Sequence, residues 1–239
     1  MRKYLPCILF ILLLGFCPAS AYFPFPSLTG ASGLTRIPDA TVLPYKNWNL
    51  ATDYGARYND TGNAQHQPAF YYKANLGTFH NFELGLVGGL DSAGQELRDG
   101  VFINMKYAPS IGDGSDPLLL AIGCENLASK TQTAVYMVAT KPFVQGPKLS
   151  FGFLADFPGN KFRPLGMAGL DVPISTLSLL ADIFAGESLV QINGGVRYRI
   201  MPTFAFEGRA INILGDSQTP TLQKDPKQLL LGFSWINPF

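Results

Sequence analysis

The chain has 239 residues, of which 47% are hydrophobic and 15% are charged, with 25 Gly and 18 Pro. This length suffices for one large domain or one barrel. The balance of 18 basic against 17 acidic residues lacks the positive excess of nucleic-acid-binding proteins, and we expect no nucleic-acid partner.

Residues 1–21 have the layout of a secretory signal peptide. Arg2 and Lys3 precede an apolar run over residues 8–16, and the segment ends in Ala19-Ser20-Ala21. The apolar run is shorter than the roughly 20 residues of a spanning helix. We therefore predict cleavage after Ala21 rather than a membrane anchor.

Cysteine positions agree with this interpretation. A lipoprotein modified at Cys17 is disfavoured, because Phe16 in front of it is bulky. Cys7 and Cys17 leave with the signal peptide, so Cys124 remains alone in the mature chain. No intramolecular disulfide is expected.

A leader of 25 residues, 22–46, separates the signal peptide from the first predicted strand. Its glycines and prolines make it irregular rather than helical. Two interpretations stay open: a periplasmic plug in the barrel mouth, or a flexible leader.

The rest of the chain, residues 47–239, predicts a transmembrane β-barrel. No apolar stretch of 18 or more residues follows residue 21. Segments of about ten residues instead alternate apolar with small or polar side chains. In the first, Trp48, Leu50 and Tyr54 fall on one face, with Asp53 and Arg57 on the other. A soluble β-sandwich would also alternate, but the aromatic faces and charged opposite faces favour a barrel.

The segments predict an all-β, antiparallel barrel of about twelve strands, with links of alternating length. Long links at 59–67, 91–99 and 213–226 are expected on the outer side, and tight links at 78–80 and 173–175 on the inner side. The least regular segments, 117–143 and 162–184, leave ten or fourteen strands open. The strands are predicted near residues 47–58, 68–77, 81–90, 100–109, 117–127, 132–143, 148–157, 162–172, 176–184, 188–200, 202–212 and 227–237.

The last predicted strand resembles the C-terminal signal that the barrel assembly machinery reads. It contains Phe233 and Trp235 and ends on Phe239, the last residue. Pro238 is tolerable at a strand end. We expect the lipid bilayer and the assembly machinery as partners, and the bacterial outer membrane as the location.

Charges on the predicted inner faces balance, with seven acidic against seven basic residues. Because unpaired charge in a narrow interior is costly, we expect pairing across neighbouring strands. Arg197, Arg199 and Arg209 are the candidates for contacting an anionic glycan. The candidate lumen-facing residues are Asp53, Arg57, Lys73, Glu83, Lys106, Arg197, Arg199, Glu207 and Arg209.

Enzyme chemistry has little support. Barrel enzymes that transfer acyl chains pair a nucleophile with a histidine base, and the chain has only His66 and His80. These are predicted at opposite ends, which leaves His66 as the one candidate base of a lipid- or glycan-modifying enzyme. No ligand spacing for a metal appears, and we predict no metal, no cofactor and no catalytic residue.

Residues 27–58 resemble the opening of YjbH-like outer-membrane proteins. The matching features are Gly33-Leu34, Pro38-Asp39-Ala40 and Leu43-Pro44, followed by the strand that begins at Trp48. The resemblance implies a non-enzymatic outer-membrane barrel that assists export or surface assembly of exopolysaccharide, with polysaccharide as a partner. A general small-solute pore, a structural barrel and a small barrel enzyme remain the alternatives.

Overall fold

The computed structural model describes residues 24–58, 67–90, 100–109, 118–127, 129, 132–143, 146–158, 161–187, 189–217 and 227–237. The predicted signal peptide, His66 and Phe239 lie outside them. Within these ranges no helix is long and apolar enough to cross a membrane. The strands are β1 (Trp48–Tyr58), β2 (Gln67–Phe79), β3 (Phe82–Leu90), β4 (Phe102–Tyr107), β5 (Leu119–Glu125), β6 (Gln132–Pro142), β7 (Lys148–Pro158), β8 (Arg163–Ile174), β9 (Leu177–Ala185), β10 (Leu189–Met201), β11 (Phe204–Ser217) and β12 (Lys227–Asn237).

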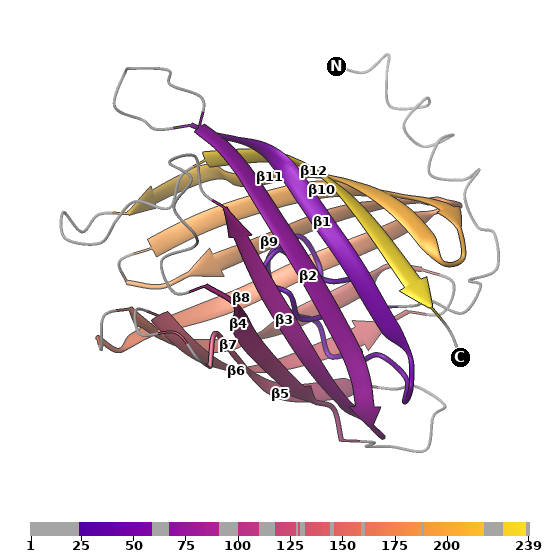
Figure 1. Ribbon diagram of the computed structural model, residues 1–239. Helices are drawn as coiled ribbons and strands as arrows, with labels where there is room; N and C mark the ends of the chain where they lie inside the picture. The colour runs from indigo at the N-terminus through magenta and orange to yellow at the C-terminus, as the bar shows by residue number, and fades with distance from the viewer. Residues whose placement is uncertain are drawn as a thin grey trace, which may run out of the picture.

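All twelve strands form one closed antiparallel barrel, in which each strand pairs with its neighbours in sequence (Figure 1). Closure is made by β1 and β12, whose register runs from Trp48 opposite Asn237 to Tyr58 opposite Lys227. The predicted antiparallel barrel is therefore confirmed, with twelve strands. We call its two ends the Trp48 end and the Tyr58 end, after the first and last residues of β1.

The strand faces follow from the alternation in sequence. On β1 the lumen-facing Asn49, Ala51 and Asp53 are buried, whereas Leu50 and Tyr54 are exposed. Tyr54 is 64% exposed and Leu231, at the middle of β12, is 75% exposed. Many other large apolar side chains cover the outside, a surface suited to lipid rather than water.

One strand runs past its predicted end because of a β-bulge. The sequence predicted residues 202–212, but β11 continues to Ser217. The register against β10 shifts between Ile192 and Gly194, and Asn212 at this point has a φ of 56°. A bulge inserts extra residues and breaks the two-residue alternation, so the pattern stopped there although the strand did not. Two other predicted strands, 100–109 and 117–127, are shorter in the structure.

Residues 24–47, which we call the plug, lie inside the barrel. The indigo trace before β1 runs through the lumen in Figure 1. Two isolated bridges, Pro26 with Ser32 and Gly33 with Pro38, fold the segment back on itself. Every third residue from Phe25 to Leu43 is apolar and buried: Phe25, Leu28, Ala31, Leu34, Ile37, Ala40 and Leu43. This spacing matches neither a helix nor a strand. It distributes buried apolar side chains along the whole length of the folded segment.

Candidate functional site

The site is the lumen of the barrel together with the plug that occupies it. Of the predicted lumen-facing residues, seven are almost fully buried there: Asp53, Lys73, Glu83, Lys106, Arg197, Glu207 and Arg209. Arg57 lies near the Tyr58 end, where Nη2 donates to the Tyr71 hydroxyl at 2.7 Å. Arg199 lies near the Trp48 end, where Nη2 donates to the carbonyl of Ser175 at 2.9 Å.

Five of these residues form one charged cluster on the wall that runs from β10 through β11, β12 and β1 to β2. Arg197 Nε lies 3.1 Å from Glu207 Oε1, and Arg209 Nε lies 3.5 Å from Asp53 Oδ1. Arg209 also pairs with Glu207, and Lys73 pairs with Asp53. Pairing within the wall satisfies these buried charges.

The same arginines also hold the plug. Arg209 Nη2 donates to the carbonyl oxygen of Pro26 at 2.9 Å, and Arg197 Nη2 donates to that of Gly33 at 3.3 Å. The Arg197 guanidinium lies 4.8 Å from the centroid of the Phe25 ring, within the range of a cation–π contact. Two of the three arginines predicted to contact a glycan, Arg197 and Arg209, therefore face the plug backbone, whereas Arg199 bonds the turn at Ser175.

On the adjoining strands β3 and β4, Glu83 is the main anchor of the plug. Its Oε1 accepts a hydrogen bond from the backbone N of Ser32 at 2.8 Å, and its Oε2 accepts one from the backbone N of Leu43 at 3.0 Å. Lys106 Nζ lies 3.9 Å from Glu83 and donates to the Ser32 carbonyl at 2.8 Å. Hydrogen bonds to charged groups contribute about 1.5–3 kcal/mol each, so this pair fixes the plug firmly.

A third contact region lies on β9 and β10. Asp182 Oδ2 accepts a hydrogen bond from the backbone N of Arg36 at 2.8 Å. Arg36 Nη1 donates to Gln191 Oε1 at 2.8 Å, and its guanidinium lies 5.5 Å from the Phe184 ring centroid. Arg36 comes from the plug and was not among the predicted site residues. No local sequence pattern identified Arg36, because it lies in an irregular segment without the alternation of a strand.

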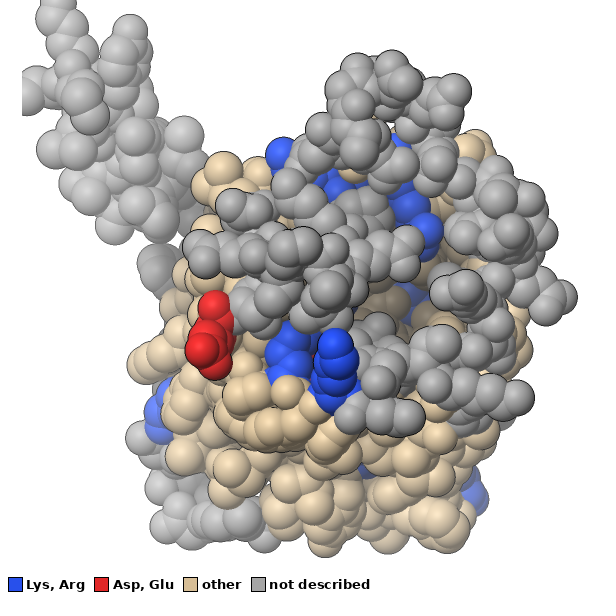
Figure 2. Space-filling model, turned by 90° about the vertical axis from the view of Figure 1, so that its left-hand side faces the viewer, with Lys and Arg blue, Asp and Glu red and all other residues tan. Residues whose placement is uncertain are grey.

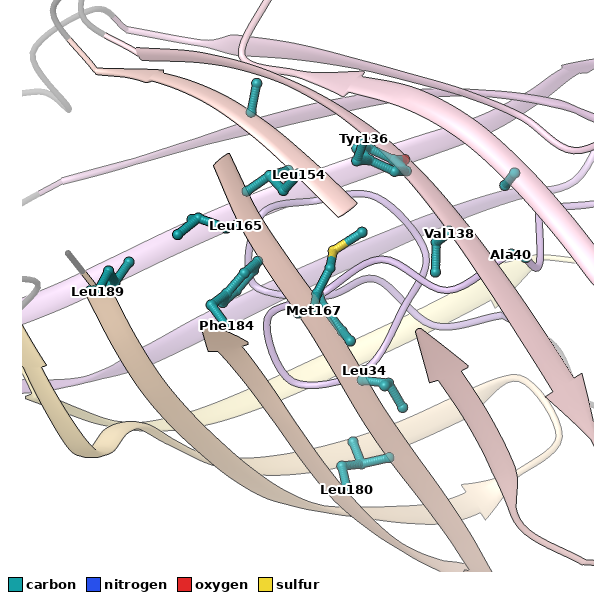
Figure 3. Close-up of a cluster of buried hydrophobic side chains, with 13 residues drawn as sticks. Leu34, Ala40, Tyr136, Val138, Leu154, Leu165, Met167, Leu180, Phe184 and Leu189 are labelled. Carbon is teal, nitrogen blue, oxygen red and sulfur yellow. The ribbon is translucent and has the colours of Figure 1, made fainter. Parts of the chain in front are cut away.

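Apolar packing completes the seating of the plug. Leu34, Ile37 and Ala40 belong to one buried cluster with residues of β5 to β10, including Tyr136, Met167 and Leu180 (Figure 3). A Cβ on Gly169 of β8 would lie 2.2 Å from Leu34 Cδ1 and 2.8 Å from Ile37 Cδ1. The absent side chain at this wall position leaves the space that the plug fills.

The predicted assembly-signal residues on β12 lie on the outer surface. Trp235 and Phe233 are partly exposed there, and the Trp235 ring contacts the ring of Trp48 edge-on at 4.7 Å between centroids. Phe239 is outside the described residues, so its role stays a prediction.

The one histidine in the described part of the chain lies outside the lumen. His80 lies at the turn between β2 and β3, with its ring 5.3 Å from that of Tyr45, and His66 is outside the described residues. No group of three or more metal-ligating side chains occurs in the described part of the chain.

Comparison with known proteins supports the fold. No known family matches the sequence, and no curated protein matches it. The structure is similar to the KdgM porin, with a TM-score of 0.54 and 12% identity over 77% of this chain and 98% of that one. It also matches the translocator domain of the autotransporter NalP from Neisseria meningitidis, with a TM-score of 0.43, 10% identity, and 81% and 88% coverage. A porin of Rhodopseudomonas blastica matches with a TM-score of 0.40 and 6% identity over 80% of this chain and 99% of that one. At these identities the likeness to the KdgM porin shows the barrel fold alone.

Proposed function

We propose that the chain is a non-enzymatic barrel of the bacterial outer membrane, closed at rest by its plug, that assists export or surface assembly of an exopolysaccharide. The Trp48 end then faces the periplasm and the Tyr58 end faces outward. An even strand number places the two ends of the barrel sequence on one side, as in other outer-membrane barrels.

The outer surface supports the membrane position. Large apolar side chains are exposed along the strands. A lipid bilayer removes this apolar surface from water without a protein partner. Near the Trp48 end, Trp48, Trp235 and Phe204 form an aromatic group, in which Phe204 stacks on Trp235 at 5.8 Å. Aromatic residues are typical of the interface between lipid and water.

The observation that supports a closed barrel is the position of residues 24–47 inside the lumen. The plug is bonded to three regions of the wall, through Glu83, Asp182 and Arg209. Its seven regularly spaced apolar side chains, from Phe25 to Leu43, are buried within the barrel. A polymer cannot pass while the segment stays in place, so transport requires the plug to move.

The exopolysaccharide role rests on the resemblance to YjbH-like proteins. The resemblance covers residues 27–58, and its motifs Gly33-Leu34, Pro38-Asp39-Ala40 and Leu43-Pro44 lie within the plug. The segment that resembles the group is thus largely the segment proposed to close the barrel.

The role is tested in cells that lack this gene, complemented with the wild type or with a variant lacking residues 24–46. Surface polysaccharide is quantified, and heat-modifiable barrel in the outer membrane is measured as the control for assembly. We expect cells that lack the gene to lose surface polysaccharide, and cells complemented with the wild-type gene to recover it. Normal surface polysaccharide in cells that lack the gene contradicts the role. Free passage of small solutes through the wild-type protein favours a general pore.

A further inference from the structure

The lumen has two unlike walls. Strands β10 to β12 and β1 to β4 carry the charged cluster together with Glu83 and Lys106. Asp182 lies on the opposite wall, and Glu125 and Asp171 border that wall toward the Tyr58 end and the Trp48 end. Most of its buried side chains are nevertheless apolar and in mutual contact. We call this set on β5 to β9 the apolar wall; it includes Ala121, Tyr136, Val138, Leu154, Met167 and Leu180.

The plug covers the apolar wall. Its side chains Leu34, Ile37 and Ala40 belong to the same buried cluster. Movement of the plug, which the proposed transport requires, takes these three side chains away and leaves the wall facing water. A contiguous apolar surface that faces water is characteristic of a site for an apolar ligand or a lipid. The opened barrel therefore offers a site for an apolar chain.

The barrel is least continuous between β4 and β5. Their register contains three residue pairs, formed by residues 105–107 with residues 122–124, whereas the register of β6 with β7 contains eleven. Toward the Trp48 end, residues 119–121 of β5 pair with β6 but with no residue of β4 in the described part of the chain. We call this stretch the seam. Because few ladder hydrogen bonds hold it, the two strands can separate here at the lowest cost.

Apolar side chains line the seam from the outer surface to the lumen. Leu118 and Ile122 are exposed on the outside, Ala108 and Leu119 are partly buried and pack against the apolar wall, and Ala121 belongs to that wall. An acyl chain that passes here contacts carbon along its whole path. The mouth at the Tyr58 end differs, because Lys and Arg side chains lie around it (Figure 2). The seam is thus the apolar route into the lumen.

We propose that the seam is a lateral portal, through which the acyl chain of a membrane lipid reaches the apolar wall once the plug has moved. The chain takes the place of Leu34, Ile37 and Ala40, and the polar headgroup faces the charged cluster. The seam lies where the two walls meet, so a lipid that enters there meets each wall with the matching part. The inference rests on the proposed movement of the plug, and it names a lipid-bearing molecule as the substrate class.

The test uses vesicles that contain a phospholipid with a photoactivatable diazirine at the end of one acyl chain. The full chain and a variant that lacks residues 24–46 are reconstituted, irradiated and mapped by mass spectrometry. Tyr136 and Met137 are matched reporters, because they are neighbours on β6 and are 2% and 60% exposed. We expect labelling of Met137 in both proteins and labelling of Tyr136, the lumen reporter, in the deletion variant alone. Glu83→Gln, which keeps the whole chain but weakens the hold on the plug, should also label Tyr136.

A disulfide across the seam tests the route. Ala108→Cys and Ala121→Cys, next in the register of β4 with β5, are combined with Cys124→Ser in the deletion variant. Opposed cysteines on neighbouring strands have the spacing of a disulfide. Leu170→Cys with Ala181→Cys, an opposed pair on β8 and β9, is the matched control. We expect the seam disulfide to abolish labelling of the lumen reporter, its reduction to restore labelling, and the control disulfide to change nothing.

Three results overturn the proposal. They are absence of lumen labelling in a folded, conducting deletion variant, equal lumen labelling in the full chain, and lumen labelling that persists with the seam disulfide formed. In the last case the lipid enters through a mouth of the barrel. A deletion variant that conducts without lumen labelling refutes the portal and leaves the closed barrel intact. A folded deletion variant that does not conduct contradicts the closed barrel itself, so the two failures are distinct.

Discussion

Glu83 of the wall and Ser32 of the plug are joined by two hydrogen bonds, from the Ser32 backbone N to Oε1 at 2.8 Å and from the Ser32 hydroxyl to Oε2 at 2.5 Å. The same carboxylate accepts a third from the backbone N of Leu43. One wall residue thus fastens two points of the plug that are far apart along its loop.

Replacing Glu83 with Gln should loosen the plug. The variant keeps the size of the side chain but presents an amide N–H to donors of the plug, so at least one charged hydrogen bond is lost, at about 1.5–3 kcal/mol. A loss of 1.4 kcal/mol changes an equilibrium tenfold. We expect the open fraction in planar bilayers to rise at least tenfold.

Asp156→Asn is the control for this variant, since Asp156 bonds Arg163 of the wall. It should keep the wild-type open fraction. Equal traces for Glu83→Gln and the wild type would mean that Glu83 does not hold the plug closed.

Gly169→Leu should displace the plug by steric conflict. Leu34 Cδ1 and Ile37 Cδ1 occupy the position of the new side chain, and overpacking a close-packed interior costs about 1–3 kcal/mol. We expect more frequent channel opening and faster protease cleavage within residues 24–47. Gly166→Leu on the same strand is the control, because a Cβ there has its nearest neighbour at 3.6 Å. Equal behaviour of the two variants would remove the wall glycine from the seating of the plug.

Glu207→Ala should destabilise the closed barrel strongly. It leaves Arg197 and Arg209 without their shared carboxylate, and removing one partner of a buried ion pair costs about 3–5 kcal/mol. Urea unfolding in lipid vesicles measures the change. Glu187→Ala, an exposed position, should stay within about 0.5 kcal/mol of the wild type.

The cost of Glu207→Ala should shrink in a chain that lacks residues 24–46. Water then enters the lumen and solvates both arginines, so the charges no longer lack a partner. An undiminished cost in that background would show that the wall itself, not the plug, buries the cluster.

Arginine substitutions on the outer surface should cost more free energy near the middle of the bilayer than near its edge, and Leu231→Arg tests the middle. Leu231 lies at the middle of β12 and is exposed, so arginine there should cost about 2–4 kcal/mol in lipid. Met201→Arg, at the Trp48 end of β10, should cost about 0–1 kcal/mol. The two variants are compared by unfolding in vesicles of the same lipid. Equal costs would contradict a bilayer centred on the middle of the strands.

The barrel could be predicted from sequence because each strand carries its own pattern. Alternation on β1 separates Tyr54 from Asp53 without knowledge of any other strand, since lipid and lumen impose opposite demands on the two faces. The bulge at Asn212 marks the limit of this reasoning. There the alternation changes, and the predicted strand ended five residues before Ser217.

Placement of the plug could not be predicted from local pattern. Its contacts join residues far apart in sequence, such as Arg209 with Pro26 and Asp182 with Arg36. Wall charges were identified from their strand faces, but Arg36 lay in an irregular segment with no such reference. The three-residue spacing from Phe25 to Leu43 becomes meaningful only once a surrounding wall is known.

Single-channel conductance in planar bilayers, compared between the full chain and a variant lacking residues 24–46, tests closure most directly. Heat modifiability of both proteins establishes that each barrel is folded. We predict a closed trace for the full chain and a steady open channel for the variant. A full chain that already conducts, or a folded variant that stays closed, would contradict the assignment of residues 24–47 as the closing element.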